Sequence, residues 1–318
     1  MNNGVSSSAS DTPPVFEAPT VRELARFYRG GAEPANRSAL VPINLAGSRP
    51  PVIAVPGVGG NVLGFADLAR ELGSDQPFFG LQSIGLNGAR EPLESIEEMA
   101  VQYLREVRQK QPHGPYYLLG ACFGSAVAHE MAHQLLNVGQ EVAFLALIDP
   151  SLLNADVKRP SVVRMPAEIK RGFALARFVT NRFYLYRDEM KRIGFRDRLQ
   201  FVRGKAQLIG EALKMRDLFR GDRREFLQHR VTDTNLRAML RHAHKPLKGG
   251  AMAFEIFVSE PRFDKMSVST RVAWNALSGR PAEFHRMPGK DSGDMLSGNN
   301  AKALAILLSK RLQRARRK

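Results

Sequence analysis

Apolar runs of strand length alternate with segments of helical period between residues 50 and 150. The runs are short and rich in Val, Ile, Leu and Phe, which is typical of buried strands. The predicted strands are 52–55, 78–82, 116–119 and 142–148, and the predicted helices are 64–72, 95–111 and 125–137. This alternation with short connections predicts an α/β fold with a doubly wound, mainly parallel sheet.

The strand rhythm stops after Asp149 and returns near residue 250. In between, the apolar positions have a helical period at 166–179, 183–192 and 198–219. Insertions at the carboxyl ends of sheet strands commonly become active-site lids, so we expect a helical lid here. The sheet then resumes with predicted strands at 251–258 and 282–287 and predicted helices at 272–277 and 300–313.

These changes divide the chain into four segments. Residues 1–20 are polar and Ser-rich, which predicts a disordered tail, and residues 21–150 form the first part of the core, with a short helix at 21–28 and a strand at 39–45. Residues 151–247 form the basic helical lid, and residues 248–318 complete the core. The N-terminal segment lacks the basic and apolar regions of a secretory signal, which predicts a cytoplasmic protein.

The composition excludes several classes of protein. Apolar side chains make up 43% of the 318 residues, enough for a large core, yet no run is long enough to span a bilayer. The single cysteine excludes an intramolecular disulfide and a multi-cysteine zinc site. We therefore expect no membrane span, no bound metal and no resident cofactor.

The formal net charge of +16 is spread unevenly, with basic side chains concentrated in residues 158–230 and 310–318. Solvated helix faces and a frayed basic end would explain it, and so would nucleic acid, anionic lipid or an acidic protein as partner. Because the basic residues are not interleaved with stacking aromatics, nucleic-acid binding is not expected.

The strongest chemical motif is Gly120-Ala121-Cys122-Phe123-Gly124, which follows a predicted strand and precedes a predicted helix. It matches the Gly-x-Ser-x-Gly nucleophile elbow with Cys in place of Ser. Glycines flank the nucleophile because neighbouring Cβ atoms would collide in so sharp a turn. The N-terminus of a helix stabilises negative charge, so we expect Cys122 to be partly ionised without further help. The alternative is an inert buried cysteine.

A second glycine-rich loop, residues 55–61, follows the strand at 52–55. In an oxyanion hole of this kind, one backbone N–H comes from such a loop and one from the residue after the nucleophile. We assign these donors to Val58 and Phe123. A plain turn or a phosphate-binding loop is the alternative, although the segment has neither a Gly-Lys-Ser/Thr ending nor the dinucleotide-binding spacing.

With these motifs, the sequence resembles the thioesterase domains of nonribosomal peptide and polyketide synthetases, which have the α/β-hydrolase fold. The resemblance is carried by residues 51–65, 112–120, the elbow, 127–136 and 145–150, and continues weakly through 235–312. It implies that Asp149, 27 residues after Cys122, is the acid of a catalytic triad. It also implies substrates held as acyl thioesters on the phosphopantetheine of a carrier protein, commonly an acidic protein that would suit a basic lid.

The sequence departs from that family where the catalytic histidine is expected. Family members carry it in a Gly-x-His segment before a Met-Leu pair, but residues 288–296 contain no histidine, and Asp291 or Ser292 takes its place. The general base therefore stays open between His285, His242 or His244, and no histidine at all.

The two departures compensate chemically, because a serine hydroxyl needs a base and a thiol near a helix N-terminus needs it less. We expect a thioesterase-like enzyme of natural-product biosynthesis that forms a Cys122 acyl-enzyme and then hydrolyses, cyclises or transfers the acyl group to water, an amine or a thiol. Asp149 or Asp291 would accept the proton of an incoming amine. The alternative is a catalytically silent scaffold or carrier-protein-binding protein that keeps the fold.

Overall fold

The computed structural model describes residues 38–150, 223–248, 252–279 and 281–317. The chain divides into two compact units, one formed by Met1–Val157 with Arg224–Lys318 and the other by Lys158–Arg223. The predicted tail at 1–20 and the helices expected at 21–28, 166–179, 183–192 and 198–219 lie outside the described residues.

A seven-stranded sheet in the order β1-β3-β2-β4-β5-β6-β7 forms the centre of the first unit, within the described ranges. All neighbours are parallel except the antiparallel pair β1 and β3 at one edge. The strands are β1 (Leu40–Asn44), β2 (Val52–Val55), β3 (Phe78–Leu81), β4 (Tyr116–Ala121), β5 (Val142–Ile148), β6 (Ala253–Ser259) and β7 (Glu283–Met287). The predicted doubly wound α/β sheet is confirmed.

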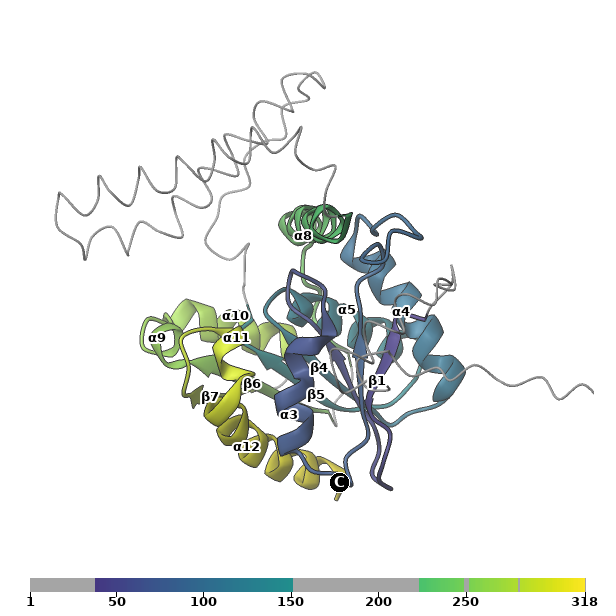
Figure 1. Ribbon diagram of the computed structural model, residues 1–318. Helices are drawn as coiled ribbons and strands as arrows, with labels where there is room; N and C mark the ends of the chain where they lie inside the picture. Colours follow the sequence, from purple (N-terminus) through teal and green to yellow (C-terminus); the bar gives the residue numbers. More distant parts are fainter. Residues whose placement is uncertain (1–37, 151–222, 249–251, 280, 318) are drawn as a thin grey trace, which may run out of the picture. The chain divides into compact units, whose positions relative to one another are not determined.

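Helices cover both faces of the sheet (Figure 1). One hydrophobic core lies under α4 (Ile96–Lys110), α5 (Phe123–Asn137) and α10 (Val268–Ser278), and the other under α3 (Ala66–Glu71) and α12 (Gly298–Arg316). The strands between these layers are apolar on both faces, and β2 and β4 are buried throughout. This two-sided burial explains why the sequence shows continuous apolar runs there.

Local signals set the helix ends. The Ser95 side chain caps α4 by accepting from the Glu98 N–H at 3.2 Å, and acidic residues follow in the first turn. α10 begins after the Ser267 cap and ends at Gly279, which has φ 66°. These caps explain why the predicted helix positions agree with the structure to within a few residues.

Three helices of the described residues were not predicted as separate elements: α8 (Arg223–Arg241) and the short helices α9 (Glu260–Phe263) and α11 (Ser292–Met295). α8 falls in the segment expected to be lid, but it contacts the core through hydrogen bonds to the loop after β2. Residues 224–247 accordingly belong to the same compact unit as the sheet.

The carboxyl ends of the central strands bring distant parts of the chain together. Ala121 pairs with Ile148, and Ile148 pairs with Phe257, so β4, β5 and β6 end side by side. The residues that follow these strands, Cys122 and Asp149 among them, therefore meet at one edge of the sheet, where ligands bind in open α/β folds.

Candidate active site

Cys122 occupies a sharp turn between β4 and α5. Its φ of 50° and ψ of −113° are strained for a residue with a side chain. The turn is held by the Cys122 N–H, which donates to the Ile148 carbonyl at 2.8 Å, and by the Cys122 carbonyl, which accepts from the Ser125 N–H at 3.1 Å. The predicted strand, turn and helix are confirmed; the role of Cys122 as nucleophile stays a prediction.

The glycines of the elbow are required by close backbone contacts. A Cβ on Gly124 would lie 2.2 Å from the Val55 carbonyl oxygen, and a Cβ on Gly120 would lie 2.4 Å from the Gly124 carbonyl oxygen. Both contacts are far inside van der Waals separation, so no other residue fits without moving the backbone. The expected steric reason for the two glycines is therefore confirmed.

The surroundings of the Cys122 thiol raise its pKa above the ordinary value. Burial is the largest cause, and the negative charge of Asp149 acts in the same direction; the Phe123 N–H, the Arg262 charge and the Ser292 hydroxyl oppose them. The expectation that the helix N-terminus alone would leave the thiol partly ionised is wrong. The loss of water around the sulfur raises the thiol pKa by more than the Phe123 backbone N–H lowers it.

Asp149 directly follows β5, with φ 50° and only 2% of its surface exposed. Its Oδ1 accepts from the Ser259 N–H at 3.1 Å and from the Ser259 hydroxyl at 3.0 Å, and its Oδ2 lies 3.2 Å from Arg262 Nη1. The carboxylate predicted as the triad acid is thus held by a serine and an arginine.

Ser292, and not Asp291, acts on the thiol at the place where a histidine was expected. The Asp291 carboxylate is exposed and caps the short helix α11 (Ser292–Met295) by accepting from the Asp294 N–H at 2.9 Å. The Ser292 side chain lowers the pKa of the Cys122 thiol. Asp291 is therefore engaged in helix capping, and its proposed part in proton transfer has no contact to support it.

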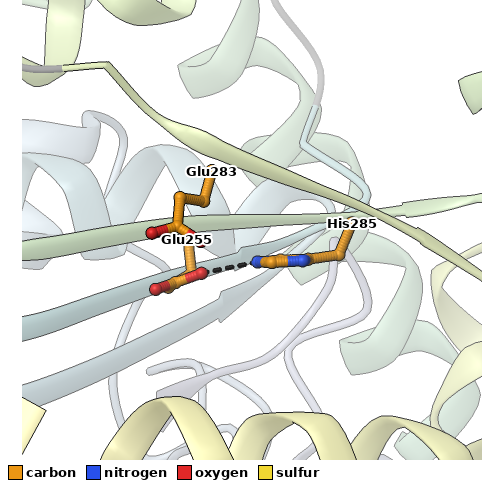
Figure 2. A group of neighbouring side chains, drawn as sticks. All are labelled: Glu255, Glu283 and His285. Carbon is orange, nitrogen blue, oxygen red and sulfur yellow. Dashed lines mark hydrogen bonds and ion pairs between the residues drawn. The ribbon is translucent and has the colours of Figure 1, made fainter. Parts of the chain in front are cut away.

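His285 lies away from the elbow, on β7. It pairs with Phe257, which pairs with Ile148, which pairs with Ala121, so it is three strand spacings, about 14 Å, from the strand that ends at the elbow. Its Nε2 lies 2.5 Å from Glu255 Oε2 (Figure 2). The role of general base predicted for His285 therefore has no geometric support.

Figure 2 shows His285 with Glu255 and Glu283, a group whose ligand atoms all lie within 4.8 Å of one another, as in a metal site. Cationic side chains already neutralise these carboxylates: Arg311 lies 2.6 Å from Glu283 and 3.7 Å from Glu255. A metal ion would have to displace Arg311, so the group is an ion-pair network that ties α12 to β6 and β7.

The remaining candidate bases, His242 and His244, lie in a buried aromatic cluster. The His244 ring is 4.9 Å from that of His242, 5.0 Å from that of His129 and 5.5 Å from that of Trp274, measured between centroids. Burial lowers the pKa of His244 to about 4 and that of His129 well below its ordinary value. All seven histidines lie in the described ranges, and none is among the groups that act on the Cys122 thiol.

The loop predicted to supply an oxyanion donor lies beside the elbow. A Cβ on Gly57 would be 3.9 Å from the Cys122 Cβ. The Gly57 carbonyl accepts from the Gly60 N–H at 2.8 Å. In a trans peptide the C=O and N–H groups point in opposite directions, so the Val58 N–H points away from Gly60. The assignment of Val58 and Phe123 as oxyanion donors stays a prediction.

Two side chains of α8 hold this loop from above the sheet. Asn235, buried to 1% exposure, donates to the Val58 carbonyl at 2.9 Å and to the Ser83 hydroxyl at 3.3 Å. Gln228 donates to the Gly59 carbonyl. Neither residue could be identified from the sequence, because only the fold brings α8 to a loop about 170 positions earlier in the chain.

A cavity of about 240 Å³ opens beside Arg262. Its apolar wall comes from β6, the loop after α9 and α10, and its polar wall includes two cations and a hydroxyl; the lining residues are Pro150, Ile256, Val258, Arg262, Lys265, Met266, Thr270 and Trp274. Because Arg262 also contacts Asp149, the cavity adjoins the residues around the elbow.

Comparison with known proteins agrees with this geometry. The family model described as "Thioesterase domain" matches residues 50–194, which include the loop at 55–61, the elbow and Asp149. This part of the chain is therefore similar to thioesterase domains, including those of nonribosomal peptide synthetases.

Two curated relatives and one solved structure show the extent of the similarity. The chain is 45% identical over 137 residues to malpinin synthetase of Mortierella alpina and 43% identical over 137 residues to indigoidine synthase of Dickeya dadantii (strain 3937). These matches cover 42% and 43% of this chain but only 2% and 9% of the relatives. A four-domain nonribosomal peptide synthetase bound to AMP and glycine shares the fold, with a TM-score of 0.62 and 21% identity over 93% of this chain and 22% of the other.

No helix in the described ranges combines the length and the apolar character that crossing a bilayer requires.

Proposed function

We propose that this protein is a thioesterase-like acyl-transferring enzyme whose nucleophile is Cys122. Its substrate would be an acyl or peptidyl thioester on the phosphopantetheine of a carrier protein, in natural-product biosynthesis. The observation that carries the proposal is the position of Cys122 at φ 50° between β4 and α5, directly before Phe123, whose backbone N–H lowers the pKa of the thiol. This conformation is costly and is typical of a nucleophile presented at the top of the sheet.

The first half-reaction exchanges one thioester for another. Cys122 releases its proton to solvent water, its sulfur attacks the thioester carbonyl, and the carbonyl oxygen takes the negative charge near the Phe123 and Val58 N–H groups. The bond to the pantetheine sulfur then breaks, and that sulfur leaves with the electron pair and takes up a proton. Since one thioester replaces another, the step is nearly balanced in free energy.

The second half-reaction is expected to favour amine or thiol acceptors over water. Water must give up a proton to a base as it attacks, and no histidine is among the groups at the thiol. An amine or a thiol is a stronger nucleophile and needs less help. Amide formation, cyclisation and transfer to a second thiol are therefore the expected outcomes, with slow hydrolysis in competition.

The cavity beside Arg262 is a suitable place for the acyl group. It adjoins Asp149 through Arg262 and offers the apolar side chains of Val258, Met266 and Trp274 as a wall. Its volume of about 240 Å³ suits a short chain or a small ring and not a long peptide. The formal net charge of +16 supports an acidic carrier protein as the partner.

The test is acylation by a synthetic acyl-pantetheine thioester, followed by intact-protein mass measurement. Wild-type protein should gain the mass of one acyl group, and Cys122→Ala should gain none. Adding water alone, cysteamine or glycine after removal of the donor then shows which acceptor discharges the adduct. An adduct lost as fast in buffer as with cysteamine would contradict the preference against water.

The raised thiol pKa and the engagement of Asp149 by Arg262 also favour a second function, a silent protein that binds a carrier domain without chemistry. The same experiment separates the two. Failure of every acyl donor to form an adduct, together with retained binding of a phosphopantetheinylated carrier domain, would establish the scaffold.

A further inference from the structure

Arg262 stands next to Asp149 on α9 (Glu260–Phe263), the short helix that directly follows β6. Its Nη1 donates to the Asp149 backbone carbonyl at 2.7 Å and lies 3.2 Å from Asp149 Oδ2, and its Nη2 donates to the Pro150 carbonyl at 2.9 Å. The guanidinium therefore spans two backbone carbonyls and one carboxylate, which fixes its position at the end of β5.

In a catalytic triad the acid orients a histidine and stabilises its positive form. Asp149 makes the corresponding contact with a guanidinium instead, while Ser259 satisfies its Oδ1. An arginine never gives up its proton in a protein, so this partner cannot carry a proton to or from the reacting sulfur. It can only supply a fixed positive charge.

We infer that Arg262 takes the place of the triad histidine. Asp149 holds the Arg262 guanidinium, and the positive charge of this guanidinium stabilises the anionic form of the Cys122 sulfur. The use of this charge in acyl transfer rests on the proposed function, whereas the effect on the thiol does not.

The electrostatic balance at the sulfur supports this inference. Burial raises the pKa of the Cys122 thiol and the Asp149 charge raises it further, and Arg262 is the one cationic side chain among the described groups that lower it. Without Arg262 the buried sulfur would face a carboxylate with no compensating charge, and its pKa would rise again.

A fixed charge suits exchange between thiols better than a proton carrier does. Thiolate attack forms the new carbon–sulfur bond, and cleavage of the old one leaves the electron pair on the departing sulfur, so an anion enters and an anion leaves. No proton has to move between attack and cleavage, because Cys122 releases its proton beforehand and the departing sulfur takes one up afterwards. A fixed positive charge stabilises both the attacking thiolate and the departing thiolate, so it favours the forward and the reverse exchange equally.

The single cysteine permits a direct test, because every alkylation event reports on Cys122. The rate of alkylation by iodoacetamide, followed by intact-protein mass from pH 6 to pH 11, gives the pH at which the thiolate forms. In Arg262→Gln this midpoint should rise by about one pH unit, and alkylation below the midpoint should slow about tenfold. Arg262→Lys keeps the charge but loses the fork, and should shift the midpoint by less than half as much.

Arg271→Gln is the matched control, because it also removes one positive charge. The Arg271 guanidinium lies 4.9 Å from the centroid of the Phe263 ring and is not among the groups that act on the thiol. Its midpoint should equal that of the wild type. Circular dichroism confirms the fold of each variant. If Arg262→Gln does not fold, Arg262→Met, which keeps the apolar stem, provides the charge-free variant.

A folded, charge-free variant with the wild-type midpoint would overturn the inference, and so would an equal shift in Arg271→Gln. The outcome is independent of acyl transfer. An Arg262-dependent midpoint in a protein that never forms an acyl adduct would support the inference and reject the proposed enzyme. Adduct formation with an Arg262-independent midpoint would do the reverse.

Discussion

Arg262 Nη1 lies 3.2 Å from Asp149 Oδ2 at the carboxyl ends of β5 and β6. The pair places one positive and one negative charge near the Cys122 sulfur, and the two act on the thiol in opposite directions. The acid that the sequence assigns to a triad is therefore the partner of an arginine. This relationship changes the expected effect of altering Asp149.

Asp149→Asn should lower the pKa of the Cys122 thiol. The substitution removes a negative charge that raises this pKa, while Arg262 keeps its hydrogen bonds to the backbone carbonyls of residues 149 and 150. The alkylation midpoint should fall by roughly half to one pH unit, so alkylation at neutral pH should become faster. A conventional triad acid would give the opposite result, since its loss slows the nucleophile. A rise of the midpoint in a folded variant would reject this prediction.

Asn235→Leu should slow the acylation of Cys122, although we expect residue 235 to act through the loop at 57–60 and not on the acyl group itself. The change removes the donor to the Val58 carbonyl and leaves the loop at residues 57–60 free to shift away from the developing oxyanion. We expect about a tenfold lower rate of adduct formation and a loss of about 1–2 kcal/mol in the free energy of unfolding.

Asn137→Leu is the control for this change. Asn137 lies at the exposed end of α5, where it contacts His133. The Asn137→Leu variant should be acylated at the same rate as the wild-type protein. Equal rates in the Asn235 and Asn137 variants would show that the contact from α8 has no part in positioning the oxyanion loop.

Met266→Trp should make acylation selective for small acyl groups. The larger side chain would fill part of the 240 Å³ cavity beside Arg262. Octanoyl-pantetheine should acylate Cys122 about tenfold more slowly than in the wild type, while acetyl-pantetheine should react at an unchanged rate. Val272→Trp, on the exposed side of α10, should change neither rate. An equal slowing of both donors would place the acyl group elsewhere.

The fold should become less stable as the pH falls from about 6.5 toward 4. Burial lowers the pKa of His244 from 6.5 to about 4, and that of His129 also lies well below its ordinary value, so the unfolded chain binds more protons in this range. Stability is therefore fully present above pH 6.5 and falls by up to about 1.4 kcal/mol per pH unit for each such group.

His244→Phe keeps an aromatic ring beside Trp274 but removes one of these groups. Melting curves at pH 7 and pH 5 should lie closer together in this variant than in the wild type. The exposed His113→Asn should leave the difference unchanged. If the difference is as large in the His244 variant as in the wild type, the buried cluster is not the source of acid sensitivity.

Most of the sheet could be predicted because its strands are buried on both faces. The run 142–148 reads as uninterrupted apolar residues and forms β5 over the same seven positions. The antiparallel edge formed by β1 and the contact of α8 with the core could not be read from the pattern. Both depend on which distant surfaces the elements meet, and hydrophobic periodicity carries no information about partners.

The candidate site divides in the same way. Cys122 and its glycines could be found because the elbow is a local motif whose geometry depends on neighbouring residues. Ser292 was one of two candidates left open by the missing histidine. Arg262 could not be found, because it lies 140 residues after Cys122 and carries no motif of its own; a proline at the start of α9 marks only the beginning of the helix.

The α/β class, the elbow at Cys122, the acidic residue after β5 and the lack of a histidine in residues 288–296 could all be read from the sequence. These are properties of short segments, in which local packing and backbone strain act between neighbours. The folded structure was needed to show that Asp149 holds Arg262, that His285 belongs to an ion-pair network with Glu255, and that burial raises the thiol pKa. Each of these depends on charges and excluded water brought together from distant parts of the chain, and electrostatic effects follow distance in space and not in sequence.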